Sequence, residues 1–413
     1  MRFLICLSLS LLAAVTPVFG AEAILTVEAG RHDRDRTPIA VELPEDWVAR
    51  EGTTYLLATT RDETSPNPEQ RNDGDRAWFS WILEAPLPAG ESRRYEVIWQ
   101  DLPAPDAVMK CVESEASITI TSGNQVVLNY VKTPTPAASE NDSVYTRTGY
   151  LHPVNTPTGK TVTGDYPEDH PHQHALFNAW TKTTFEDRAL NFWDQKQATG
   201  RIAHARTGAT ASGPVFAQFT TEQRHEDITD PEMPNAVLDE TWLVRVYQAG
   251  DDLHLFDLKT TQRCASESPL VIEKYHYGGM AFRGNSEWFN PDKKAVPPAD
   301  FLTGTGLGRI EGNHSRENWV ALSGPAGDSP SGIAIFSHPG NFRAPQWVRL
   351  HPSKPYFVFT PQVEQGFAIE PGKPYTSHFR YAVFDGTPDP ELLESIWNDF
   401  AHPPKTTFAV SAP

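Results

Sequence analysis

The fold is decided by the stretch Thr241-Trp-Leu-Val-Arg-Val-Tyr247, which is followed by Leu253-His-Leu-Phe-Asp-Leu258. Both segments are rich in β-branched, aromatic and leucine residues, which favour extended backbone. Residues 248–252 separate them and include Gly250, a residue suited to turns. The pattern predicts two antiparallel strands joined by a short connection, that is, a β-hairpin.

Similar apolar segments recur along the chain, and they indicate many short strands joined by turns. The 36 prolines and the scarcity of helical periodicity favour the same reading. We therefore predict a mainly β protein built around a large antiparallel β-sandwich. The further predicted strands are Ser117-Ile-Thr-Ile-Thr121 and Gln125-Val-Val-Leu-Asn-Tyr130 (a hairpin around Gly123), Gly332-Ile-Ala-Ile-Phe336, Tyr356-Phe-Val-Phe359 and His378-Phe-Arg-Tyr-Ala-Val-Phe384.

One helix is predicted, over residues 389–401, near the C-terminus. It begins at Pro388-Asp-Pro390, a sequence typical of helix starts. Its apolar stripe at helical spacing consists of Leu392, Leu393, Ile396, Trp397 and Phe400.

The chain is long enough for two domains. We predict a small N-terminal β domain over residues 22–104 and a linker over 101–106. A larger main domain, the β-sandwich, then spans 107–404 and carries the candidate site.

Residues 1–20 predict a signal peptide. Arg2 supplies the positive start, residues 3–15 the apolar stretch, and Val18-Phe-Gly20 the small-residue cleavage pattern before Ala21. A retained membrane anchor is the alternative, but the apolar run is shorter than a membrane span. The expected product is a periplasmic or secreted protein with no membrane span after signal cleavage.

The net charge of −18 argues against nucleic acid as a partner, although a local basic pocket for an acidic sugar is still compatible with it. Cys6 would leave with the signal. Cys111 and Cys264 could form a disulfide or stay as two buried thiols, and neither belongs to a CxxC motif.

The run Asp169-His-Pro-His-Gln-His174 is the strongest candidate site. If its backbone is extended, His170, His172 and His174 point to one face. Imidazoles transfer protons near neutral pH and also bind metals, so both chemistries are open. Structural hydrogen bonding is the third reading, because Pro171 interrupts regular strand pairing.

Other candidate residues come from further along the chain. His276 and Arg283 flank the Gly278-Gly279 pair, where backbone can approach a ligand closely. A metal site would need one more ligand, from His152, His276 or His338. We predict His172, His174, His276 and Arg283 as catalytic residues around one pocket. The predicted substrate-binding residues are His152, Asp169, Trp180, Trp193, Asn341 and Arg343; the candidates for an assisting carboxylate are Asp169, Asp194, Glu240 and Glu364.

Several motifs resemble a bacterial exported family that is commonly labelled "methane oxygenase PmoA". The label would imply a membrane methane monooxygenase subunit with several spans, which this sequence lacks after its signal. Members of that family commonly show His-His-Arg at the position of His172-Gln-His174. The motifs are Gly149-Tyr-Leu-His-Pro153, the histidine run, Asn191-Phe-Trp-Asp194, Tyr277-Gly-Gly-Met-Ala-Phe-Arg283, His338-Pro-Gly-Asn341, Phe379-Arg-Tyr381 and Asp385-Gly386.

The resemblance implies a fold similar to galactose-mutarotase-like supersandwich domains, which act on sugars or serve polysaccharide lyases and hydrolases. We therefore expect an exported carbohydrate-active protein, an enzyme of lyase, hydrolase or epimerase type that uses histidine on a glycan or sugar derivative. Two alternatives stay open: a metal-dependent oxidoreductase with a divalent metal as its cofactor, and a non-catalytic sugar-binding module. No GxSxG, P-loop or HExxH motif is present.

Overall fold

The computed structural model describes residues 23–43, 54–59, 69–73, 76–83, 85–100, 106–135, 144–292 and 295–410. The predicted signal peptide over residues 1–20 lies outside these ranges, as does all of the predicted linker except Asp106.

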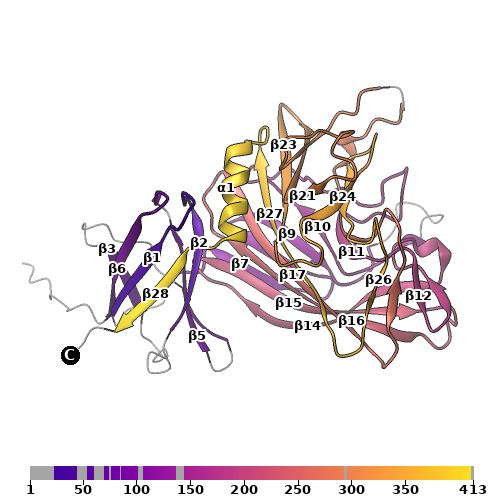
Figure 1. Ribbon diagram of the computed structural model, residues 1–413, viewed down its shortest axis with the longest axis horizontal. Helices are drawn as coiled ribbons and strands as arrows, with labels where there is room; N and C mark the ends of the chain where they lie inside the picture. Colours follow the sequence, from indigo (N-terminus) through magenta and orange to yellow (C-terminus); the bar gives the residue numbers. More distant parts are fainter. Residues whose placement is uncertain are drawn as a thin grey trace, which may run out of the picture.

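A nine-stranded and an eight-stranded antiparallel sheet form the main body (Figure 1). The first has the order β21-β24-β25-β19-β11-β10-β9-β8-β7 and the second β14-β15-β16-β17-β27-β23-β22-β20. The strands of the first sheet are β7 Met109–Glu113, β8 Ser117–Ser122, β9 Gln125–Val131, β10 Tyr150–Val154, β11 Leu176–Ala179, β19 Gly279–Arg283, β21 Arg316–Glu317, β24 Gln346–Leu350 and β25 Tyr356–Phe359. Those of the second are β14 Gly200–Ala211, β15 Phe216–Asp227, β16 Asn235–Tyr247, β17 Leu253–Cys264, β20 Asp300–Thr303, β22 Trp319–Ala326, β23 Ser329–Ser337 and β27 Tyr375–Asp385.

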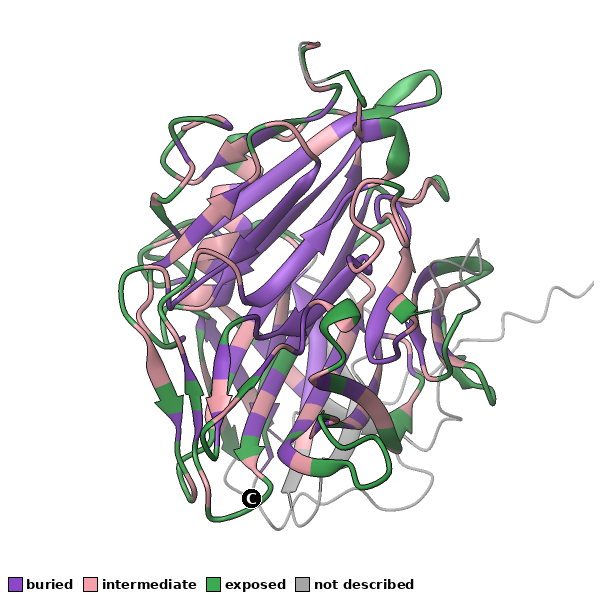
Figure 2. Ribbon diagram, turned by 90° about the vertical axis from the view of Figure 1, so that its right-hand side faces the viewer, coloured by how far each residue is buried: buried purple, intermediate pink, exposed green. Residues whose placement is uncertain are grey.

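Alternation along these strands places one face of each sheet in a shared core. Trp242, Val244 and Val246 of β16 belong to the same buried cluster as Leu128 and Tyr130 of β9. Figure 2 shows the strand centres as buried and the loop tips as exposed. The prediction of a mainly β, antiparallel sandwich is therefore confirmed, including both predicted hairpins.

A third, small sheet lies beside the candidate site and connects loops that form it. Its order is β13-β12-β18-β26. Its strands are β12 Thr183–Phe185, β13 Arg188–Leu190, β18 Leu270–Ile272 and β26 Phe367–Ile369.

The N-terminal region forms two further sheets, with orders β28-β1-β6-β3 and β2-β5-β4. Leu25, Val27, Trp81, Tyr95 and Val97 fill the core between them. The edge strand β28 follows the main domain in sequence and lies outside the predicted range 22–104. The strands are β1 Ala23–Glu28, β2 Thr37–Glu42, β3 Thr54–Thr59, β4 Glu69–Asp73, β5 Arg76–Leu83, β6 Ser92–Gln100 and β28 Lys405–Val410.

The predicted helix is confirmed as α1 (Pro390–Ala401). The Asp389 side chain caps it by accepting hydrogen bonds from two backbone N–H groups of the first turn. Figure 1 shows α1 between the N-terminal sheets and the main sandwich. Its Asp399 accepts hydrogen bonds from Arg34 at 2.8 Å and from Thr37 at 2.7 Å, so the helix fastens the N-terminal region to the sandwich.

Cys111 and Cys264 are both free, which leaves the disulfide unformed and favours the reading as two separate thiols. In the part of the chain that the structure describes, no helix has the length and apolar character of a membrane span.

Candidate functional site

A pocket of about 230 Å³ lies where five loops of the main domain meet the first residue of β25. Its lining combines imidazole, aromatic, amide and carboxylate groups, a mixture typical of binding sites for polar organic ligands. The lining residues are His170, His172, Gln173, Thr181, Asn191, Trp193, Asp194, Gln197, Tyr275, Tyr277, His351 and Tyr356.

The histidine run forms consecutive turns and not a strand. The His170 N–H donates to the Pro167 carbonyl at 3.0 Å, and the Gln173 N–H donates to the His170 carbonyl at 2.9 Å. The prediction that all three imidazoles share one face is therefore wrong. Proline cannot donate a ladder hydrogen bond, and the turns around Pro171 end the period-two alternation.

As a result, His170 and His172 line the pocket, whereas His174 is fully buried at 0 % exposure. The His174 Nδ1 lies 2.7 Å from an Asp165 carboxylate oxygen, and its Nε2 lies 2.8 Å from the Tyr145 carbonyl oxygen. Both ring nitrogens are thus occupied inside the protein. His174 holds the loop in place and does not reach the pocket, which corrects its predicted position there.

His172 is an imidazole of the pocket lining that can accept a proton from a ligand. Burial lowers its pKa to about 4, although the Asp194 carboxylate opposes the shift. At neutral pH the ring is therefore uncharged and carries one unprotonated nitrogen. Asp194, which also lines the pocket, is placed to stabilise the imidazolium that would form.

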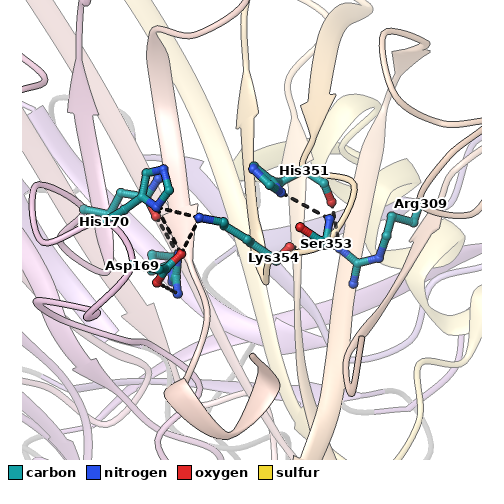
Figure 3. A network of polar contacts seen from close by, with 8 residues as sticks. Asp169, His170, Arg309, His351, Ser353 and Lys354 are labelled. Atoms are coloured by element: carbon teal, nitrogen blue, oxygen red, sulfur yellow. Dashed lines mark hydrogen bonds and ion pairs between the residues drawn. The ribbon is translucent and has the colours of Figure 1, made fainter. Parts of the chain in front are cut away.

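Asp169 and Arg283, predicted as a substrate-binding and a catalytic residue, do not line the pocket and instead pair with each other behind it. The carboxylate of Asp169 accepts from two Arg283 nitrogens at 2.7 and 3.2 Å and lies 2.7 Å from the Lys354 ammonium (Figure 3). Burial alone would raise the Asp169 pKa, but hydrogen bonds and charges of its basic neighbours lower it well below its usual value. Arg283 is 1 % exposed and also donates to Gln173 at 2.9 Å.

A backbone contact fixes the tautomer of one of the two imidazoles in the adjoining wall of the pocket. The Ser353 N–H donates to His351 Nδ1 at 3.2 Å, so the neutral His351 ring carries its proton on Nε2. His170 Nδ1 lies between a donor and an acceptor: it is 2.7 Å from the Lys354 ammonium and 3.0 Å from an Asp169 carboxylate oxygen. Burial, aided by the charges of Lys354 and Arg349, lowers the His351 pKa to about 3.

Aromatic rings form another side of the pocket. Trp193 packs against Tyr277 and Tyr356 with ring centroids 6.2 and 6.0 Å apart, and Tyr275 is 38 % exposed at the rim. Trp193 thus lies where stacking on a sugar was predicted. Trp180 does not, because it is fully buried and its Nε1 donates to Gln262 at 2.8 Å.

Two of the predicted histidines, His276 and His152, do not line the pocket. His276 packs between the rings of Tyr275 and Tyr277, at centroid distances of 4.3 and 4.5 Å. His152 is on β10, where its Nδ1 lies 2.9 Å from the Thr163 hydroxyl. The predicted cluster of His172, His174, His276 and Arg283 around one pocket is therefore wrong in this detail, since only His172 lines it.

Asn341 and Arg343 hold loops and do not line the pocket. Asn341 accepts from the His378 N–H at 2.7 Å and donates to the His378 carbonyl at 2.9 Å. Arg343 donates to three carbonyls of residues 361–366. In that segment, the Gln362 side chain donates to the carbonyl of Tyr277 at 2.7 Å, which links Arg343 indirectly to the tyrosine wall.

Of the other candidate carboxylates, Glu240 is fully buried, with hydrogen bonds to His225 at 2.6 Å and to Trp242 at 2.7 Å. Glu364 lies on the surface, 61 % exposed. Among the residues that the structure describes, no group of three or more His, Cys, Asp or Glu side chains is arranged to hold a metal ion.

Sequence reasoning missed much of the pocket. Tyr275 and Tyr277 flank His276, a predicted site residue, so the aromatic character of this loop could be recognised in the sequence. His351 and Lys354 stand in a short loop between β24 and β25 with no motif around them. Only the pairing of distant strands brings that loop to the histidine run.

Residues 117–398 match the profile of a family described as "Family of unknown function (DUF6807)". The chain belongs to this family. The matched range contains every residue that lines the pocket. No curated protein matches the chain.

Solved structures of low similarity include a protein in the glycosyl hydrolase family 38 from Enterococcus faecalis, with 11% identity, a TM-score of 0.45 and coverage of 95% of this chain and 48% of that one. An alpha-mannosidase from Enterococcus faecalis also matches, with 11% identity, a TM-score of 0.40 and coverage of 95% and 46%. This chain thus spans about half the length of these structures. Likenesses of this size say nothing of its activity.

Proposed function

We propose that this protein is an exported carbohydrate-active protein that binds a sugar or sugar derivative in the pocket. One observation carries the proposal: a neutral imidazole, a carboxylate and several aromatic rings line the same cavity of about 230 Å³. Aromatic faces suit the apolar faces of sugar rings, while amides and imidazole N–H groups suit their hydroxyls. The resemblance to exported proteins with a galactose-mutarotase-like fold supports the same proposal.

His172 is the proposed general base. In its neutral form it accepts a proton from a ligand hydroxyl or from an acidic ligand carbon, and Asp194 stabilises the charge that develops. Trp193 and Tyr277 hold the ring of the sugar in place. His351 donates a hydrogen bond from Nε2.

The test is a screen of the purified protein against a glycan array, together with product analysis by mass spectrometry. His172→Gln should abolish turnover while glycan binding persists. His204→Gln, on β14 outside the pocket, is the control and should leave both unchanged. Binding of no saccharide by the wild-type protein would refute the proposal.

The same screen, together with metal analysis of the purified protein, separates the two alternatives. Glycan binding without any product would identify a non-catalytic sugar-binding module. Stoichiometric copper, iron or zinc in the purified protein, with activity lost on chelation, would identify a metal-dependent oxidoreductase. Export is tested by fractionating cells that express the full chain and a variant that lacks residues 1–20.

A further inference from the structure

Building on the proposed function, we infer that the sugar bound in this pocket carries a carboxylate group, which binds at the wall formed by His170, His351 and Tyr356. The ligand class is therefore an acidic sugar, such as a uronate, and not a neutral one. The inference depends on the charges behind this wall and on the donors that it presents.

The wall is backed by a local excess of positive charge. Arg283 and Lys354 share one carboxylate, that of Asp169, at 2.7 Å from each. Two cations and one anion leave one positive charge at this point. The excess contrasts with the whole chain, whose formal net charge is −18.

Two more guanidinium groups add to the excess. Arg309 is 7 % exposed and donates to the carbonyls of His351 and Lys354, both at 2.8 Å (Figure 3). The carboxylate of Asp300 on β20 attracts the Arg309 charge, but Asp300 is exposed, so water screens this attraction. Arg349 donates to the Asn313 amide oxygen at 2.9 Å and to a carbonyl at 2.7 Å, both of them uncharged acceptors.

The wall also presents hydrogen-bond donors. His351 carries its proton on Nε2, because the Ser353 N–H occupies its Nδ1 atom. Tyr356 lines the pocket, and within the described part of the chain its buried hydroxyl makes no hydrogen bond. Buried polar groups in native proteins are nearly always partnered, so this hydroxyl points to a ligand acceptor.

One residue of the lining carries the opposite charge. Asp194 lines the pocket, and its carboxylate would repel an anionic group of the ligand. His172 lies next to the wall, with its ring centroid 5.3 Å from that of His170. A ligand whose carboxylate binds at the wall therefore places its adjacent hydroxyl-bearing part beside His172.

The experiment compares acidic sugars with their neutral parents by calorimetry or ligand-observed NMR at pH 7. The probes are D-glucuronate and D-galacturonate against D-glucose and D-galactose. The better uronate should bind at least about tenfold more tightly than its neutral parent at low salt, because a charge a few ångströms away in a partly buried site is weakly screened. The preference should shrink in 1 M NaCl, where the Debye length is about 3 Å.

Lys354→Gln should remove most of the uronate preference while affinity for the neutral sugar changes much less. Lys132→Gln is the matched control, since Lys132 is 13 % exposed and pairs with Glu113 outside the pocket, whereas Lys354 is 16 % exposed. If Lys354→Gln does not fold, the salt dependence of the wild-type protein decides the question alone.

Neutral sugars that bind as well as uronates would overturn this inference and leave the proposed function in place. An unchanged uronate preference in Lys354→Gln would also overturn it. Failure to bind any sugar, acidic or neutral, would overturn both proposals.

Discussion

Replacing Asp169 by Asn tests whether the wall of the pocket is a buried charge network. Asn keeps the shape of Asp and one acceptor oxygen, but it removes the charge that pairs with Arg283 and Lys354. Charge-assisted hydrogen bonds contribute roughly 1.5–3 kcal/mol each. Because the Asp169 side chain is 12 % exposed, we take the lower value for each cation and expect a loss of about 3 kcal/mol in the free energy of unfolding.

The pH dependence of this difference has a defined sign. The Asp169 pKa in the folded protein lies below the unfolded value of 3.8, so the carboxylate contributes its stability above that pH. The difference between wild type and Asp169→Asn should stay constant from about pH 8 to 5 and should shrink as the pH falls below about 4. Urea unfolding followed by tryptophan fluorescence, at several pH values, measures it.

Asp239→Asn is the control. Its carboxylate pairs with Arg224 at 3.0 Å on the surface, with 56 % of the Asp239 side chain exposed. Exposed pairs contribute about 0–1 kcal/mol. A loss in Asp169→Asn no larger than in this control would refute the reasoning that the network is buried and mutually dependent.

The remaining predictions concern the pocket and the core. His172→Ala should lower turnover by about 10²- to 10⁴-fold with an unchanged melting temperature, whereas a fall in melting temperature would indicate a structural role. Burial lowers the pKa of His351 in the folded protein to about 3, so the unfolded chain binds the proton first and wild type loses stability as the pH falls from 6.5 to 5. His351→Gln should reduce this loss, as measured by urea unfolding at several pH values. Phe400→Ala should cost about 3–5 kcal/mol in urea unfolding without changing turnover per folded molecule, because Phe400 is buried on α1. Arg343→Ala should weaken ligand binding, with rescue by Lys only partial, because it fastens the segment that holds Tyr277.

The strands could be predicted from sequence because alternation and turn residues are local signals. The predicted strand Tyr356–Phe359 has the bounds found in the structure, and the hairpin of β8 and β9 differs by one residue at the end of each strand. The strands β16 and β17 each extend six residues beyond the predicted ones. The helix was recognisable from the Asp-Pro start and its apolar stripe. These features depend on neighbours within a few residues.

The site was harder to predict because it depends on chain reversals and distant pairing. The histidine run identified His172, which lines the pocket. The turns around Pro171 end the strand alternation, so His174 is buried inside the protein and does not line the pocket. Lys354 reaches His170 only because β24 and β25 belong to the same sheet as β11. Strands predicted without their order in the sheet do not show which loops lie side by side.

The pairing of β28 with β1 has a consequence for biogenesis. The register joins Ala23 to Val410, so β1 is synthesised first but receives its outer neighbour only after the entire sandwich has emerged. Until then, β1 presents a free row of backbone N–H and C=O groups, which is a template for wrong partners. A polypeptide truncated before Lys405 would keep this edge of β1 unpaired, and it should aggregate or be degraded more readily than a chain that contains β28.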